Sequence, residues 1–124
     1  MIRIENKVKD KSFSLYNKIL DLKSYMERYI LNNIPKVHTD VRIHLSDEIY
    51  YLHKNMYYAS YNKGNIRMKY LVEMCVNLSM IDSMISDLKK YNTIKEKYLV
   101  NSISKINDIR NIVYGWKFNY EKEK

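Results

Sequence analysis

The chain has 124 residues, 46% of them hydrophobic and 29% charged, a length and balance that fit one globular domain and exclude a wholly disordered chain. Its 22 Lys and Arg residues outnumber its 14 Asp and Glu residues, and the resulting formal charge of +8 favours polyanionic partners. No run approaches the roughly 20 uncharged apolar residues of a membrane span, and the first residues lack the apolar run of a secretory signal. We therefore expect a cytoplasmic protein with no membrane partner.

The scarcity of turn-forming residues, two glycines and one proline, argues against a many-stranded sheet and favours long helices. The first helix is expected over residues 7–31, where apolar residues recur at spacings of three and four. Pro35 should end this segment, because proline lacks a backbone donor and pushes the preceding residue out of helical geometry, and we expect a loop through Val41. The apolar stripe of this helix consists of Leu15, Ile19, Leu22, Met26 and Tyr29.

The second helix is expected over residues 44–62. Ser46 offers a capping hydroxyl near its start, and Asp47 and Glu48 would place negative charge in the first turn, where the helix dipole favours it. Gly64 should break the helix, since glycine tolerates the left-handed backbone that closes one. The apolar stripe consists of Leu45, Ile49, Leu52, Met56 and Ala59.

The third and fourth helices are expected over residues 65–91 and 94–119. Thr93 and Glu96 match a capping box at the start of the fourth. The stripe of the third helix consists of Leu71, Cys75, Leu78, Ile81, Ile85 and Leu88, widened by Val72 and Met74. The stripe of the fourth consists of Leu99, Ile103, Ile106, Ile109, Val113 and Trp116. The residues expected to be deeply buried include Leu52, Met56, Leu78, Ile85, Ile103 and Ile106.

These four segments predict an all-α fold, an antiparallel up-down four-helix bundle formed by a single domain over residues 1–124. A short basic lead over 1–7 and a charged tail over 120–124 would flank the bundle. Apolar residues off the main stripes suggest a second buried face and hence a homo-oligomer, although wide stripes could equally reflect packing in a four-way core. These residues are Ile30, Val72, Val76 and Ile112.

The residues that could carry catalysis do not form a recognisable motif. His38, His44 and His53 lack the spacing that gathers a metal on one helical face, and Cys75 is the only cysteine. Two glycines cannot build a phosphate-binding loop. We therefore expect no enzymatic activity, no metal and no cofactor.

The span 49–72 is the most informative for function, because it carries four cations and no acidic residue. Six tyrosines are interleaved with these cations, so the segment offers both phosphate partners and flat rings for unstacked bases. The alternative for any one tyrosine is a place in the core or in an oligomer interface. The candidate nucleic-acid-binding residues are Lys54, Lys63, Arg67, Lys69, Tyr58 and Tyr61. A possible additional basic patch near the third turn consists of Lys89, Lys90, Lys95 and Lys97.

Short motifs in two places carry a family resemblance. The first place is the junction of the first two helices, with Ile34-Pro35-Lys36, Arg42-Ile43-His44-Leu45 and Asp47-Glu48-Ile49. The second is the ending Ile112-Val113-Tyr114-Gly115-Trp116. The chain thereby resembles the four-helix-bundle family of ribosomal-RNA intervening-sequence proteins and the accessory variability determinant protein of diversity-generating retroelements. The linker from Pro35 to Arg42 is a few residues longer than the usual family junction.

The resemblance implies a homopentameric, ring-shaped assembly that binds RNA or DNA. In the retroelement branch it implies a reverse transcriptase as partner and a role in mutagenic cDNA synthesis from template RNA. Two hypotheses follow. The chain is either such a nucleic-acid-binding accessory subunit, or a structural or interaction bundle of the intervening-sequence type with no dedicated nucleic-acid role.

Overall fold

The protein is built from four long helices. A computed structural model describes the backbone of residues 2–123 and the side chains of residues 14–119. The helices are α1 (Ile2–Tyr29), α2 (Thr39–Tyr61), α3 (Gly64–Asp87) and α4 (Glu96–Glu123). Single 3-10 turns lie at Leu31–Asn33, Lys36–His38 and Leu88–Lys90, and no strand occurs within residues 2–123. The prediction of an all-helical chain with four helices is confirmed.

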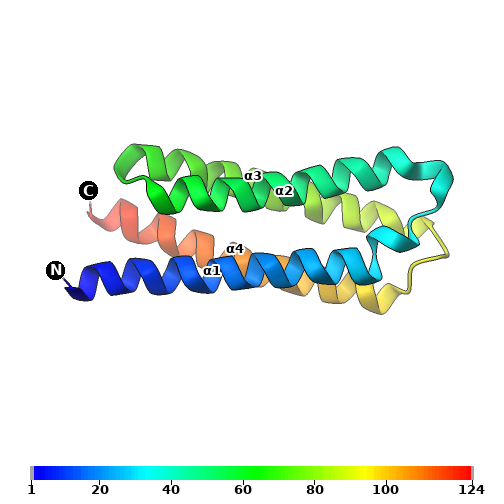
Figure 1. Cartoon of the computed structure of the whole chain (residues 1–124), viewed down its shortest axis with the longest axis horizontal. Helices are drawn as coiled ribbons and strands as arrows, with labels where there is room; N and C mark the ends of the chain where they lie inside the picture. Colours follow the sequence, from blue (N-terminus) through cyan, green and yellow to red (C-terminus); the bar gives the residue numbers. More distant parts are fainter. Residues whose placement is uncertain (1, 124) are drawn as a thin grey trace.

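The helices lie side by side along one long axis. Figure 1 shows the chain running away from its N-terminal end along α1, back along α2, away again along α3 and back along α4. Each helix packs against its neighbours in sequence, and α1 also packs against α4, so the contacts close a four-membered arrangement. The α2–α3 turn therefore lies at one end, and the α1–α2 and α3–α4 connections lie together at the other. None of these helices, within residues 2–123, contains an apolar stretch long enough to cross a bilayer.

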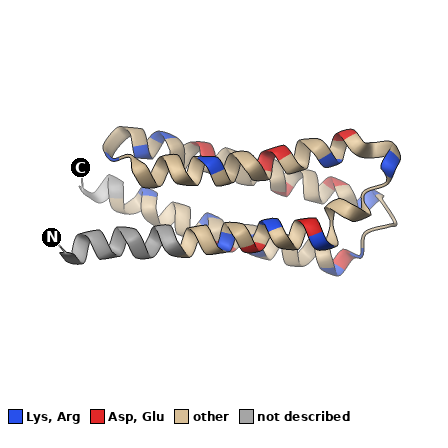
Figure 2. Cartoon of the chain, viewed as in Figure 1, with Lys and Arg blue, Asp and Glu red and all other residues tan. Residues whose placement is uncertain are grey.

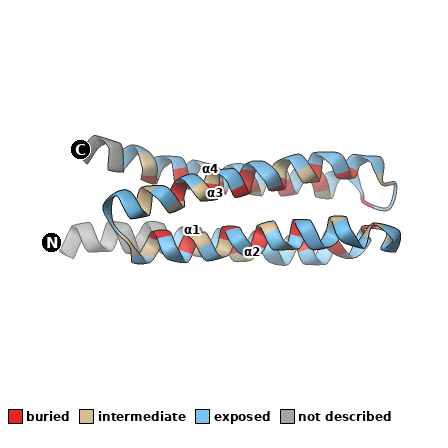
Figure 3. Ribbon diagram, turned by 90° about the horizontal axis from the view of Figure 1, so that it is seen from above, coloured by how far each residue is buried: buried red, intermediate tan, exposed pale blue. Residues whose placement is uncertain are grey.

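The buried residues, coloured red in Figure 3, lie on the inner side of the helices. On α2 the buried residues are the five of the predicted stripe. On α4 the stripe passes through Ser102, which is fully buried, and Ile103 is only partly buried. The Ser102 hydroxyl donates to the Tyr98 carbonyl oxygen at 2.8 Å, so its polarity is satisfied within the helix. The prediction that Ile103 is deeply buried is therefore wrong, while the other five residues of the predicted stripe, Leu99, Ile106, Ile109, Val113 and Trp116, are buried.

Two other stripes also differ from the prediction. Ile30, which follows the last residue of α1, is buried, while Tyr29 is partly buried. On α3 Met74 is buried as the widened stripe predicted, but Cys75 is only partly buried, Val72 is exposed, and the polar Asn77 is buried as well. In both helices the structure keeps the three-four spacing that an inward-facing stripe requires. Ile30 thus belongs to the core and not to a second buried face.

The outer side of α3 carries exposed apolar residues. Val72 and Val76 are exposed, as a second face would require, and Met80 continues the row one turn further. Ile112 is partly buried and packs against the core. Only two of the four predicted off-stripe residues therefore lie on an uncovered surface.

The predicted helix starts were less accurate than the helices themselves. α1 is already helical at Ile2, and α2 begins at Thr39, which places Ser46 inside the helix and not at its cap. α4 begins at Glu96, and the Thr93 hydroxyl donates to the Asn33 carbonyl oxygen instead of closing a capping box. A long-range hydrogen bond has replaced the local one that the sequence suggested.

The α2–α3 turn is short, with only Asn62 and Lys63 between the two helices. Gly64 adopts a positive φ of 61° at the first position of α3, a backbone geometry that side-chain-bearing residues rarely take. Asn62 donates its side-chain amide to the Tyr58 carbonyl oxygen at 2.7 Å, satisfying one of the acceptors at the end of α2. This tight reversal holds the last turns of α2 beside the first turns of α3.

Candidate nucleic-acid interface

The outer face of α2 is an array of aromatic rings. We call the following five exposed tyrosines the tyrosine face: Tyr50, Tyr51, Tyr57, Tyr58 and Tyr61. Tyr61 is the most open at 83% exposure. The part of α2 that carries these rings shows no red in Figure 2, because the sequence holds no acid from Ile49 to Val72, and its one cation is Lys54.

A groove of about 490 Å³ runs between α2 and α3 along one edge of the tyrosine face. Tyr58 and Tyr70 stack across the two helices, with ring centroids 4.8 Å apart and planes 21° from parallel. The Lys54 ammonium lies 5.8 Å from the Tyr58 ring centroid, and the Lys69 ammonium lies 5.4 Å from that of Tyr70. The α2–α3 reversal thus places two amines beside one pair of stacked rings.

The groove also has a polar lining. Asn55 donates its amide to the Asn77 side-chain oxygen at 2.8 Å, and Asn77 donates to the Glu48 carboxylate at 3.5 Å. Asn77 is 8% exposed, so this chain of hydrogen bonds satisfies a nearly buried amide. Glu73 also lines the groove and dilutes the charge of the two lysines.

Arg67 has a different environment from the three lysines of the predicted site. Its Nε donates to the Ala59 carbonyl oxygen at 2.8 Å, and a terminal nitrogen donates to the Ser60 carbonyl oxygen at 3.4 Å. Its guanidinium carbon lies 4.9 Å from the Trp116 ring centroid. The Arg67 side chain therefore joins the ends of α2 and α4 to α3, while Lys63 is exposed at the turn.

A second group of rings lies on the α1 side of the tyrosine face. Tyr57 and Tyr61 are nearly parallel, with planes at 12° and centroids 6.3 Å apart. Behind Tyr57 lie His53 at 5.1 Å and Tyr16 at 6.0 Å. Partial burial, assisted by the positive charge of Lys23, lowers the pKa of His53, and its Nε2 is buried with no hydrogen-bond partner among the described residues. This imidazole therefore contributes a neutral ring to the stack near pH 7.

The additional basic patch of Lys89, Lys90, Lys95 and Lys97 lies at the α3–α4 connection, the end opposite the α2–α3 turn. Lys90 and Lys97 each lie over the ring of the following tyrosine, at 5.4 Å and 5.2 Å. The structure therefore keeps this patch and Lys63 at opposite ends of the molecule.

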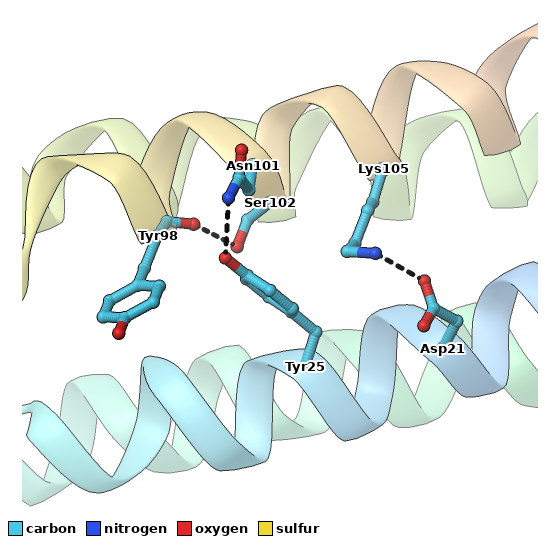
Figure 4. Close-up of polar contacts among 6 residues, drawn as sticks. All are labelled: Asp21, Tyr25, Tyr98, Asn101, Ser102 and Lys105. Carbon is cyan, nitrogen blue, oxygen red and sulfur yellow. Dashed lines mark hydrogen bonds and ion pairs between the residues drawn. The ribbon is translucent and has the colours of Figure 1, made fainter.

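One aromatic and cationic cluster was missed by the sequence analysis. On the seam between α1 and α4, Tyr29 and Tyr98 stack at 4.6 Å, and Tyr25 lies beside them. Figure 4 shows Asn101 donating to the Tyr25 hydroxyl and Lys105 paired with Asp21 at 2.6 Å. The spacing of Tyr25 and Tyr29 by four residues indicates that the two rings lie on one side of a helix. The residues that they contact on α4 are about 70 positions away in the sequence, so the cluster could not be predicted from one segment. These contacts hold α1 and α4 together along their shared edge.

Within the described part of the chain, no three His, Cys, Asp or Glu side chains form a group able to hold a metal ion. Burial raises the pKa of the Cys75 thiol, which disfavours the nucleophilic thiolate.

Comparison of the chain with models of protein families, with curated proteins and with solved structures finds no match.

Proposed function

We propose that the chain is a non-enzymatic nucleic-acid-binding subunit that contacts its ligand through the tyrosine face together with Lys54, Lys63 and Lys69. The observation that carries the proposal is the groove in which each ring of the stacked Tyr58–Tyr70 pair has a lysine amine over it. Cations neutralise phosphates, and exposed rings offer surfaces on which bases stack.

The wider proposal adds the partners that the family resemblance implies. The chain would act in the cytoplasm as an antiparallel up-down bundle repeated in a ring of five copies, and would assist a reverse transcriptase in mutagenic cDNA synthesis from template RNA. Support comes from the short motifs at the helix junction and near Trp116, and from the exposed apolar row on α3. A ring would multiply the modest charge of each copy.

The charge contribution is tested by reversing the two groove lysines, with Lys54→Glu and Lys69→Glu in one protein. RNA affinity should fall, and the slope of log K against log salt should become shallower by roughly 1.4–1.8, because two phosphate contacts are lost. The measurement is an anisotropy titration of labelled RNA at several salt concentrations.

The control carries the same change of charge at the other end of the bundle, with Lys95→Glu and Lys97→Glu. Circular dichroism should show both variants folded. If the groove variant keeps the affinity and slope of the parent while the control loses them, the phosphates are bound at the α3–α4 end. Arg67 is left unchanged in this test because its guanidinium binds the Ala59 and Ser60 carbonyls.

Self-association should be visible by light scattering at micromolar concentration as a mass that is a multiple of 15.1 kDa. Replacing Val72 and Val76 by lysine should dissociate the assembly, because it would bury charge at the exposed apolar row. Val100→Lys, at a similarly exposed valine on α4, should leave the mass unchanged. A parent protein that is monomeric would exclude the ring.

The second candidate function is a structural or interaction bundle. It is favoured by the row formed by Val72, Val76 and Met80, because such exposed apolar surface is typical of protein interfaces. Tyrosine is also enriched at protein interfaces. This candidate predicts an oligomer that does not bind RNA at any salt concentration.

A further inference from the structure

The rings of the tyrosine face are braced from behind. Tyr58 rests on Tyr70, which is partly buried and belongs to α3, and Tyr57 rests on His53 and on Tyr16 of α1. Tyr57 and Tyr58 themselves are 39% and 41% exposed. Rings that are held in place and still partly exposed lose little side-chain entropy when a flat ligand packs on their accessible part.

The two braced rings point to different sides of α2. Consecutive residues of a helix lie about 100° apart around the axis, so Tyr57 faces the α1 side and Tyr58 the α3 side. A flexible strand that crosses α2 near these two residues would meet both rings in succession.

Among the described residues, only a few cationic side chains lie near the rings of the tyrosine face. Lys54 and Lys69 line the groove together with Glu73, and Lys63 lies at the turn. Two or three phosphate contacts per subunit give a weak salt-dependent attraction, since tight electrostatic binders of duplex make six or more. Stacking must therefore supply much of the affinity.

Stacking on a side chain requires an unpaired base. In a duplex each base is already stacked and paired, so drawing one out costs free energy. The bases of a single strand are unpaired before binding and do not incur this cost. The rings of α2 would then contact only the sugar-phosphate surface of a duplex, where their faces have no partner.

We infer that the tyrosine face selects unpaired nucleotides, with bases stacked on Tyr57 and Tyr58 and phosphates held by Lys54 and Lys69. This inference rests on the proposed function and adds to it the strand state of the ligand. Base identity would matter little, because every base has a flat face.

The test compares a labelled, unstructured 15-nucleotide RNA with the same strand in a fully paired duplex and with an abasic strand of equal charge. The parent should bind the single strand at least tenfold more tightly than either of the other probes. Replacing Tyr57 and Tyr58 by leucine removes the rings and should weaken single-strand binding by about 5- to 140-fold per lost stack. The affinity for the duplex should change by less than twofold, and the slope of log K against log salt should stay close to that of the parent.

Two controls separate ring chemistry from folding. Tyr57→Phe together with Tyr58→Phe keeps both rings and should retain single-strand affinity, since the hydroxyl is not needed for stacking. Tyr114→Leu removes a similarly exposed ring on α4 and should have no effect. Circular dichroism should be the same for all variants.

The outcomes distinguish the inference from the function on which it rests. Equal affinity for single strand, duplex and abasic strand, unchanged by the leucine pair but lowered by the lysine reversals, would overturn the single-strand inference and leave nucleic-acid binding intact. Loss of binding in the phenylalanine pair as well as in the leucine pair would also overturn stacking. No binding of any probe by the parent would overturn both proposals.

Discussion

Replacing Ile106 by alanine should lower the free energy of unfolding by about 2–5 kcal/mol, because the side chain is fully buried and truncation leaves a cavity in the core. Denaturant unfolding followed by circular dichroism measures the loss. Ile103 provides a matched control, being the same residue type on the same helix but only partly buried. Ile103→Ala should cost at least about 1 kcal/mol less, since less apolar area leaves the core. Equal losses at both positions would contradict the α4 register that places Ser102 inward.

Arg67→Ala should destabilise the fold by roughly 2–4 kcal/mol, which is large for a residue in a region proposed to bind a ligand. The change removes two hydrogen bonds from a charged donor to carbonyls at the end of α2, worth about 1.5–3 kcal/mol each where both are well formed. It also removes the cation–π contact to Trp116, worth about 0.5–2 kcal/mol. The longer of the two hydrogen bonds, at 3.4 Å, is the weaker, so the total stays below the sum.

Two further variants isolate the role of the Arg67 guanidinium. Arg67→Lys keeps the charge but cannot reach two carbonyls in the same fork, so it should recover less than half of the lost stability. Lys63→Ala, four residues away and exposed, should change the free energy of unfolding by less than about 0.5 kcal/mol. An Arg67→Ala variant as stable as Lys63→Ala would contradict a stabilising role for these contacts of the guanidinium.

The sequence predicted the four helices because each carries an apolar stripe of helical period, and on α2 every buried residue was identified. The stripes failed where a polar or aromatic residue competed with an apolar one for a core position. Ser102 is buried because its hydroxyl finds the Tyr98 carbonyl within the same helix, a local solution that hydrophobicity alone does not reveal. Tyr29 was predicted to be a core residue because its ring is apolar. In the structure this ring stacks on Tyr98 of α4 and stays partly exposed, and Ile30 is the buried residue.

The sequence predicted which types of residue the candidate site contains, but not how these residues are arranged in space. An acid-free span with tyrosines and cations can be seen in the sequence, and it contains both Lys54 and Lys69. The stacking of Tyr58 on Tyr70 depends on the α2–α3 reversal, and the inward use of Arg67 depends on Trp116 from α4. Both features are tertiary, so charge and periodicity within one segment could not separate Arg67 from the lysines.

The hydrogen bond from Thr93 to the Asn33 carbonyl links two connections that are 60 residues apart in sequence. The His38 and Tyr91 rings link the same connections again, with centroids 4.8 Å apart. We therefore expect opening fluctuations at this end to be shared, because a movement that frees the α1–α2 connection breaks its contacts with the α3–α4 connection. A change in one connection should then alter how often the other is exposed to solvent exchange or to proteases.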